Sequence, residues 1–289
     1  MSNNLLDKGK DHDPTKSWVI VGNGFIAKKH KEAIYQIGHK LLAVCDYDKE
    51  KSSLEAPLFL NWKDMMDSAY FRDSIDNVAI CTPSFLHYKM ARDFARAGKR
   101  VLCEKPLTLS SREAEILPAN IFTVLQLRHH PKVKELKTRD FSKVKKVEMR
   151  IVVKRDEEYW NSWKGKELYS GGILFNIGIH YFDLLIYLFG ENYEITYCEC
   201  SKEAAEGKIV FDKRIEVQFL LLIQKLEEGQ KRELAIENES INFSSKNNLA
   251  EENLHIKVYQ DFIENKGITP VEAAKSIKLV EKLWETSQL

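Results

Sequence analysis

The chain has 289 residues, of which 44% are hydrophobic and 30% charged, with 44 basic residues against 43 acidic ones. This length suffices for two domains with separate cores, and the balanced charge argues against a partner such as nucleic acid or an anionic membrane, which requires basic residues gathered on one face. Because the first apolar cluster, Leu5-Leu6, is too short for a signal sequence and no run reaches the roughly 18 apolar residues of a membrane span, we expect a cytoplasmic protein.

Residues 1–17 are polar and hold charges of both signs, so we expect a mobile arm. The apolar run 18–21 is typical of a strand buried on both faces, and it leads directly into the sequence GNGFIA at 22–27. This is the dinucleotide fingerprint in its G-x-G-x-x-A form. Gly22 permits the tight turn, Gly24 lets a pyrophosphate approach the backbone, and Ala27 keeps helix and strand close.

The next expected strand, 41–46, ends in Asp46. A carboxylate at this position accepts the hydroxyls of an adenosine ribose and repels a 2′-phosphate, and Tyr47 beside it offers no clamp for phosphate. The pattern therefore favours NAD over NADP. The alternative is a glycine turn followed by an unrelated surface acid.

Strand and helix signals then alternate. We expect strands at 76–81, 100–103 and 121–127, a helix at 85–97, and a short helix capped by Ser110 with Glu113 three residues on. Strands separated by helices in this rhythm predict a parallel, doubly wound Rossmann sheet for residues 18–127.

The pattern changes near Pro131. Apolar residues between 144 and 153 mostly alternate with charged ones, and 193–200, 208–224 and 231–244 are similar, which predicts a mostly antiparallel sheet. An apolar helix is expected at 171–189, and two more at 254–264 and 271–285. Residues 128–289 should thus form an α+β domain with an open sheet, so the fold class is α/β followed by α+β.

The five cysteines indicate no metal site. Cys45, Cys81 and Cys103 lie at the ends of apolar runs and should be reduced core thiols. Cys198 and Cys200 alternate on an expected strand, but no second pair of soft ligands accompanies them.

The residues best suited to catalysis are Lys105 and His180. Pro106 cannot continue a strand ladder, so Lys105 should lie at the carboxyl end of strand 100–103, where open α/β sheets bind ligands. A lysine held partly out of water can lose or accept a proton there, although a surface lysine that closes a strand is the alternative. His180 titrates near neutrality and suits a base.

On a helix, Asn176 and His180 share one face, with Asp183 three residues further on and able to steer the imidazole. A buried structural histidine is the alternative for His180. Oxidation of an alcohol by these two residues requires Lys105 and His180 to approach the same substrate carbon.

Four motifs together resemble the glucose-fructose oxidoreductase/inositol dehydrogenase (Gfo/Idh/MocA) family: GNGFIA at 22–27, CTPSFLHY at 81–88, CEKPL at 103–107 and NIGIHYFD at 176–183. The resemblance implies a Rossmann domain followed by an α/β domain whose open sheet faces a partner subunit, hence a homodimer or homotetramer. It implies that Lys105 and His180 face the nicotinamide and the sugar. It also implies a Lys105–Pro106 peptide bond that is often cis in this family.

Within that family, LQLRHH at 125–130, NSWKG at 161–165 and SGGILFNIGIH at 170–180 are similar to the UDP-N-acetylglucosaminuronate (UDP-GlcNAcA) 3-dehydrogenases of bacterial surface-polysaccharide (O-antigen) biosynthesis. The resemblance implies NAD-dependent oxidation of the C3 hydroxyl to a 3-keto sugar, and it suggests that NADH is reoxidised by 2-oxoglutarate. The alternatives are a dehydrogenase or ketoreductase of another sugar, such as UDP-N-acetylglucosamine or a cyclitol, and a catalytically silent NAD(H) sensor.

The expected cofactor contacts come from the glycine turn, from the ends of later strands and from one aromatic residue of the second half. They are Gly22, Asn23, Gly24, Phe25, Ile26, Asp46, Thr82, Pro83, Leu86, His87, Glu104, Lys105 and Trp163. A nucleotide sugar acid carries a diphosphate and a carboxylate, which arginine and lysine match. The expected substrate contacts are Lys105, Gln126, Arg128, Arg155, Tyr159, Lys164, Asn176 and His180. His87 is alternatively a helix residue without a ligand.

Two departures from the family pattern are visible. The chain between Leu109 and Ile121 is short, which leaves residues 110–117 as a stub of a longer helix. Asn176 stands where inositol dehydrogenases usually carry an acid. Because an amide is a poor general base, proton transfer is left to His180 and Lys105.

Overall fold

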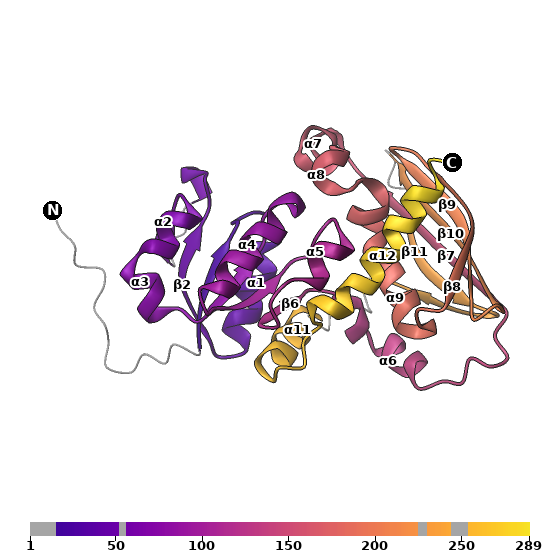
Figure 1. The fold of residues 1–289 in the computed structure, drawn as a ribbon, viewed down its shortest axis with the longest axis horizontal. Helices are drawn as coiled ribbons and strands as arrows, with labels where there is room; N and C mark the ends of the chain where they lie inside the picture. The colour runs from indigo at the N-terminus through magenta and orange to yellow at the C-terminus, as the bar shows by residue number, and fades with distance from the viewer. Residues whose placement is uncertain (1–15, 52–55, 225–229, 244–253) are drawn as a thin grey trace.

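The computed structural model describes residues 16–51, 56–224, 230–243 and 254–289. They form two lobes side by side, each built on a six-stranded sheet (Figure 1). Most of the arm expected at 1–17 lies outside the described residues, and Ser17 already begins the first strand.

The sheet of the first lobe is parallel throughout, with strand order β3-β2-β1-β4-β5-β6. Its strands are β1 Ser17–Val21, β2 Lys40–Cys45, β3 Leu58–Phe59, β4 Asn77–Ile80, β5 Arg100–Cys103 and β6 Ile121–Thr123. The central strands β1 and β4 are buried along their whole length, because helices cover both faces of the sheet. The predicted doubly wound fold is confirmed.

The helices of this lobe are α1 Ala27–Gln36, η2 Lys49–Lys51, α2 Trp62–Asp67, α3 Ala69–Ser74, α4 Ser84–Arg96 and α5 Ser111–Glu115. Sequence patterns did not indicate α2 and α3, each of which begins at a side-chain cap: Asn61 accepts from the amide of Lys63, and Ser68 from that of Phe71. The stub α5 is short, as expected. However, Ser110 does not cap it with its side chain; the amide of Ser111 instead donates to Glu281 across 2.9 Å.

The sheet of the second lobe has the order β12-β11-β7-β10-β9-β8. Its strands are β7 Lys146–Lys154, β8 Tyr193–Cys200, β9 Ala204–Phe211, β10 Ile215–Gln224, β11 Lys231–Ile236 and β12 Glu239–Asn242. Only β7 and β10 pair in parallel, so the prediction of a mostly antiparallel sheet is confirmed. The range 208–224, expected to hold strand structure with turn-like breaks, contains the end of β9, a turn and β10, and the turn residues Asp212 and Lys213 have positive φ.

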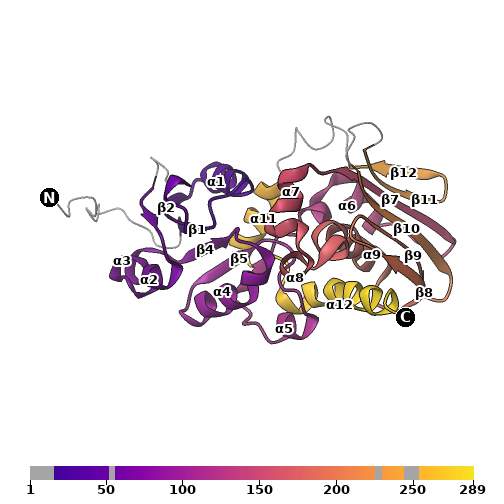
Figure 2. The same ribbon diagram turned by 90° about the horizontal axis from the view of Figure 1, so that it is seen from above.

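Helices α9 Ile179–Phe189 and α12 Pro270–Thr286 lie against one face of this sheet, and among the described residues no helix covers the other face (Figure 2). A π-helical segment, Leu174–Gly178, leads into α9. Gly178 lets this segment approach the sheet closely, because a Cβ there would lie 2.8 Å from the side chain of Leu221 in β10, which would have to move. The apolar segment Glu167–Phe189 is long enough for a membrane span, but 78% of its most apolar window is buried, so it is a core helix.

Smaller helices connect the two lobes and surround their junction. They are η3 Gln126–His129, α6 Pro131–Lys137, α7 Glu157–Asn161, η4 Trp163–Gly165 and α8 Glu167–Ser170.

Helix α11, Leu254–Ile263, belongs to the expected second domain by sequence but packs into the core of the first lobe. It lies beside α1, between the two lobes in Figure 2. The ring of Trp18 in β1 lies 4.8 Å from Tyr259 and 4.9 Å from Phe262, measured between centroids. The first lobe is therefore completed by residues from near the end of the chain.

We expect the substitution Phe262→Ala to lower the free energy of unfolding by about 3–5 kcal/mol, because Phe262 is fully buried and a cavity would remain. Denaturation in urea, followed by circular dichroism, measures the change. Val271→Ala is the matched control, since Val271 on α12 is 59% exposed and its truncation should cost about 0.5 kcal/mol or less. Equal losses for the two variants would show that α11 contributes no more to stability than a surface contact.

Candidate active site

The turn between β1 and α1 is shaped for a dinucleotide. Gly22 has a φ of +91°, and a Cβ on it would lie 2.8 Å from the carbonyl carbon of Cys81, so no other residue fits without strain. Among the described residues, a Cβ on Gly24 would meet nothing within 4 Å, and no side chain caps the N-terminus of α1. Open space beside the amides of a helix N-terminus suits a pyrophosphate, so these residues fit the cofactor predicted from the sequence.

Asp46 is fixed at the end of β2 beside this turn. The amide of Asn23 donates to its Oδ2 across 2.7 Å, and the amide of Asp48 donates to its Oδ1 across 3.0 Å. The Nζ of Lys51 lies 3.7 Å from the same carboxylate. The fold therefore brings together the glycine turn and the expected ribose ligand, with one lysine nearby that offsets part of the negative charge.

The ends of β4 and β5 adjoin, which places Thr82 and Pro83 beside Glu104 and Lys105. His87 joins the two segments: its Nδ1 lies 2.7 Å from the carbonyl oxygen of Pro106, and its Nε2 lies 2.9 Å from that of Thr82.

Both nitrogens of His87 therefore face main-chain carbonyls, which favours the reading of this residue as a helix residue without a ligand. Leu86, next to it in α4, is only partly buried. The Lys105–Pro106 peptide bond is cis, as the resemblance implied.

Lys105 connects the two lobes. Its Nζ donates a hydrogen bond of 2.7 Å to the main-chain oxygen of Asn176, in the helix that leads to His180. Burial lowers the pKa of Lys105 to about 8; Glu104 opposes this change, while the charges of Arg155 and Lys164 add to it. An amine with this pKa exchanges its proton readily near neutral pH.

His180 does not titrate as the sequence predicted. Burial, followed by the charge of Lys105, lowers its pKa well below the usual value, so the expected near-neutral titration is wrong. Its Nδ1 is buried and has no hydrogen-bond partner within the described part of the chain. The imidazole is thus neutral and is better suited to hold a hydroxyl than to take its proton.

The expectation that Asp183 steers His180 is also wrong. Asp183 instead accepts two hydrogen bonds of 2.7 Å from the guanidinium of Arg128, which also pairs with Glu272. The expected contact of Arg128 with a substrate anion is therefore replaced by an internal ion pair. Arg128 lines a pocket together with His129 and Tyr187, and this pocket contains none of the other expected substrate residues.

The other expected substrate residues mostly gather near Lys105. The side-chain amide of Asn176 donates to the hydroxyl of Tyr159 across 3.0 Å and lies 3.4 Å from the main-chain oxygen of Lys164. The guanidinium of Arg155 lies over the ring of Tyr159, 5.2 Å from its centroid. The charges of Arg155 and Lys164 thus both act on Lys105, and Asn176 contacts both Lys105 and the hydroxyl of Tyr159.

Four further predicted site residues are placed by their burial and by the elements in which they lie. Trp163 is partly buried in η4, next to Lys164. Phe25 is 82% exposed at the glycine turn, where Ile26 is the N-cap of α1. The Oε1 of Gln126 is buried without a hydrogen-bond partner among the described residues, so it can accept a hydrogen bond from a ligand.

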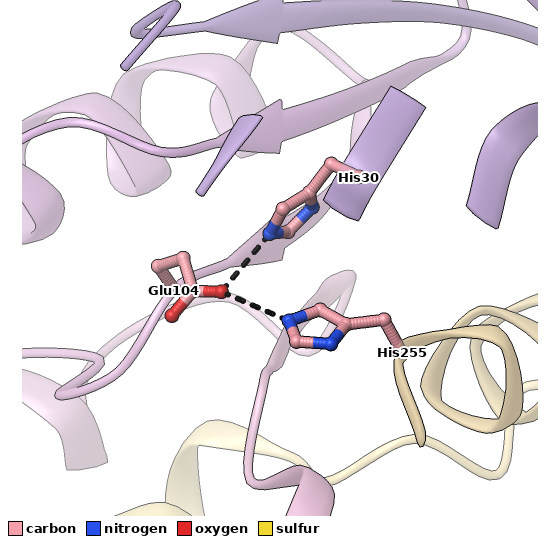
Figure 3. Close-up of side chains that lie close together, drawn as sticks. All are labelled: His30, Glu104 and His255. Carbon is pink, nitrogen blue, oxygen red and sulfur yellow. Dashed lines mark hydrogen bonds and ion pairs between the residues drawn. The ribbon is translucent and has the colours of Figure 1, made fainter. Parts of the chain in front are cut away.

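Sequence reasoning missed a cluster behind Lys105. The Nε2 of His30 lies 2.9 Å from Oε1 of Glu104, and the Nε2 of His255 lies 3.7 Å from the same oxygen (Figure 3). The signal for His30 was its place in the buried apolar stripe of α1, where a polar residue needs a partner.

Two imidazoles and a carboxylate have the composition of a metal site, and their ligand atoms lie within 4.8 Å of one another. Hydrogen bonds account for the positions of His30 and Glu104, however, and His255 approaches the same carboxylate at 3.7 Å, an ion-pair distance. The second nitrogen of His30 lies 2.8 Å from the hydroxyl of Tyr259, and the second oxygen of Glu104 accepts from the amide of Lys105. We therefore interpret the cluster as a hydrogen-bonded network.

Two family models match the chain and together span well over half of it. The Gfo/Idh/MocA model "Oxidoreductase family, NAD-binding Rossmann fold" matches residues 16–120, and the model "Oxidoreductase family, C-terminal alpha/beta domain" matches residues 133–211. Their order agrees with the two lobes.

Two solved structures of the WlbA (WbpB) dehydrogenase from Thermus thermophilus are similar to the chain at 29% identity. The complex with NAD and UDP-GlcNAcA has a TM-score of 0.80 and covers 91% of this chain and 93% of its own. The complex with NAD and alpha-ketoglutarate has a TM-score of 0.81 and covers 92% and 94%.

Among curated proteins, the inositol 2-dehydrogenase of Rhizobium meliloti is 29% identical over 205 residues, which cover 68% of this chain and 59% of the relative. The match to another curated relative covers 55% of that protein's length. The chain thus spans little more than half of these relatives.

We expect Asp183→Asn to lower the free energy of unfolding by about 3–5 kcal/mol, because the buried guanidinium of Arg128 would lose its charged partner. Thermal and urea denaturation measure the loss. Glu272→Gln should cost less, since Glu272 is 43% exposed. If Asp183→Asn left stability unchanged but altered the titration of His180, the interpretation of Asp183 as the partner of Arg128 would fail.

Proposed function

The chain belongs to the Gfo/Idh/MocA oxidoreductase family, and we propose that it is an NAD-dependent dehydrogenase that oxidises the C3 hydroxyl of UDP-GlcNAcA to the 3-keto sugar. The observation that carries the proposal is the hydrogen bond of 2.7 Å between Lys105 and Asn176. It places an amine of lowered pKa from the cofactor lobe against the helix that carries His180 in the other lobe.

The first lobe would hold the cofactor. NAD, when bound, supplies the acceptor for the hydride. The open backbone at Gly24 and the N-terminus of α1 would bind its phosphates, with Phe25 and Ile26 at their border, and Asp46 would bind the adenosine ribose. The fixed carboxylate of Asp46 supports the choice of NAD over NADP.

The cofactor site would extend toward the second lobe through Thr82, Pro83, Leu86 and Glu104. Trp163 in η4 would approach the cofactor from the second lobe.

Lys105 would take the proton of the substrate hydroxyl. Its pKa of about 8 gives an appreciable fraction of neutral amine at working pH, whereas the pKa of His180 is too low for an effective base. The neutral imidazole of His180 would hydrogen-bond to the same hydroxyl and fix its orientation. The sequence pattern left proton transfer to both His180 and Lys105; the two pKa values favour Lys105.

The second lobe would bind the nucleotide sugar. Arg155 and Lys164 supply positive charge for the diphosphate and the carboxylate, while Tyr159 and Asn176 offer polar groups beside the sugar. The Oε1 of Gln126 would accept from a sugar hydroxyl or amide. The solved Thermus complexes with UDP-GlcNAcA and alpha-ketoglutarate support this substrate and the reoxidation of NADH by 2-oxoglutarate.

We place the activity in bacterial surface-polysaccharide biosynthesis. We also propose that the chain forms a homodimer or homotetramer through the sheet face that no described helix covers. A cyclitol is the second candidate substrate, because an inositol 2-dehydrogenase is among the relatives.

We expect the purified protein to convert UDP-GlcNAcA to a keto sugar that is two hydrogens lighter, with NADH accumulating unless 2-oxoglutarate is added. Absorbance of NADH and mass spectrometry of the product measure this reaction. UDP-N-acetylglucosamine and myo-inositol are the comparison substrates. Preferential oxidation of either would overturn the assignment, and NADH binding without turnover of any substrate would indicate a sensor.

Lys105→Met should reduce kcat by at least about 10³-fold, because it removes the proposed proton acceptor while leaving NAD bound. In the native enzyme, kcat/KM should rise with pH through about 8, as the amine of Lys105 loses its proton. Lys105→Arg should lack this rise because a guanidinium stays charged. Since the charge of Lys164 lowers the pKa of Lys105, Lys164→Met should move the rise to higher pH. An unchanged pH profile in Lys105→Arg would assign the proton to another group.

A further inference from the structure

A buried polar network begins at Glu104, the residue before Lys105 (Figure 3). One carboxylate oxygen accepts a hydrogen bond of 3.1 Å from the main-chain amide of Lys105. The other lies 2.9 Å from the Nε2 of His30 and 3.7 Å from the Nε2 of His255. The Nδ1 of His30 in turn lies 2.8 Å from the hydroxyl of Tyr259.

Three elements that are distant in the sequence supply this network. His30 comes from α1, Glu104 from the end of β5, and both His255 and Tyr259 from α11. His255 and Tyr259 are four residues apart, so they lie on one face of the helix, one turn from each other. Helix α11 therefore contacts the carboxylate directly through His255 and indirectly through Tyr259 and His30.

The network determines the charge next to the proposed catalytic amine. Burial by itself would raise the pKa of Glu104, but hydrogen bonding and charge from His255 and His30 lower it well below the usual range. The carboxylate is consequently ionised. It in turn raises the pKa of Lys105 against the desolvation of that amine.

Other titratable groups face Glu104 and Lys105 from every packed element. Around Glu104 these are His30, Cys81, His87, Cys103, His180, His255 and Tyr259. Around Lys105 they are His87, Glu104, Arg155, Lys164 and His180.

Burial raises the pKa values of the two thiols and the phenol, and it lowers that of His180, so these groups stay neutral near pH 7. Burial also lowers the pKa of His87, although hydrogen bonds to two main-chain oxygens oppose it. Glu104 is thus the anion that faces Lys105.

We propose that His255 is a positioning residue, which holds the Glu104 carboxylate ionised and in place beside Lys105. The inference rests on the proposed function in one respect, namely that Lys105 carries the proton of the substrate. Without the imidazole, the carboxylate would lose one of its two side-chain partners and would turn away or take up a proton. The amine would then lose the anion that favours its charged form.

The test is the titration of Lys105 itself, measured in the full-length protein without a sugar substrate. The rate of acetylation of Lys105 at a series of pH values, followed by mass spectrometry of its peptide, gives its pKa. The native protein should titrate near 8. Glu104→Gln should lower this value by about one unit or more, since it removes the anion whose charge raises the pKa of Lys105, and His255→Leu should shift it in the same direction.

Two further variants separate positioning from general damage. His255→Gln should retain the native titration, because a glutamine amide can reach the Glu104 carboxylate, which lies 3.7 Å from the Nε2 of His255, and donate to it. His129→Asn is the matched control: His129 is another largely buried histidine, whose Nε2 lies 3.8 Å from the carboxylate of Asp261 on α11, and its loss should leave Lys105 unchanged. In kinetic assays, the rise of kcat/KM should move to lower pH in His255→Leu and not in His255→Gln.

A native titration of Lys105 in His255→Leu, together with a lowered one in Glu104→Gln, would overturn the role of His255. No shift in Glu104→Gln would overturn the network as a whole. If His255→Leu does not fold, as judged by circular dichroism, His255→Asn takes its place, because its shorter side chain also cannot reach Glu104. Labelling requires no turnover, so failure to oxidise UDP-GlcNAcA would count against the proposed function alone.

Discussion

The hydrogen bond from Lys105 to the main-chain oxygen of Asn176 is the contact on which the candidate site depends. It joins the end of a parallel strand in one lobe to the start of the core helix in the other. A main-chain acceptor fixes the amine without neutralising it, whereas a carboxylate would have raised the pKa of Lys105 and held its proton. The geometry therefore fixes the position of the lysine while its pKa stays lowered.

Burial removes water from both Lys105 and His180, and this loss of solvation is the largest cause of their lowered pKa values. Burial lowers the pKa of Lys105 to about 8 and holds the pKa of His180 well below its usual value, so at neutral pH the amine can exchange a proton whereas the imidazole stays neutral. Pairs of titratable groups with pKa values pushed apart commonly divide the roles of proton acceptor and orienting group. Glu104 limits the effect on Lys105, and its own ionisation depends on histidines from α1 and α11.

Helix α11 links the stability of the fold to the chemistry of the site. Its aromatic residues Tyr259 and Phe262 pack on Trp18 in the core of the first lobe, and its first turn brings His255 to Glu104. A helix near the end of the chain thus completes both the hydrophobic core and the polar network of a lobe that the sequence pattern ended at residue 127. Loosening this helix should affect the cofactor lobe before the antiparallel sheet.

The sequence by itself determined the parallel sheet, the glycine turn with Asp46, the antiparallel sheet and the position of Lys105, because each depends on a local pattern: apolar runs, a required positive φ at Gly22, alternation, and a proline after a strand. Only the tertiary structure decided the partners of the charged groups. Asp183 pairs with Arg128 rather than His180, and His30, Glu104 and His255 meet across more than 200 residues, because side-chain partners are chosen by packing in space, which no local spacing encodes.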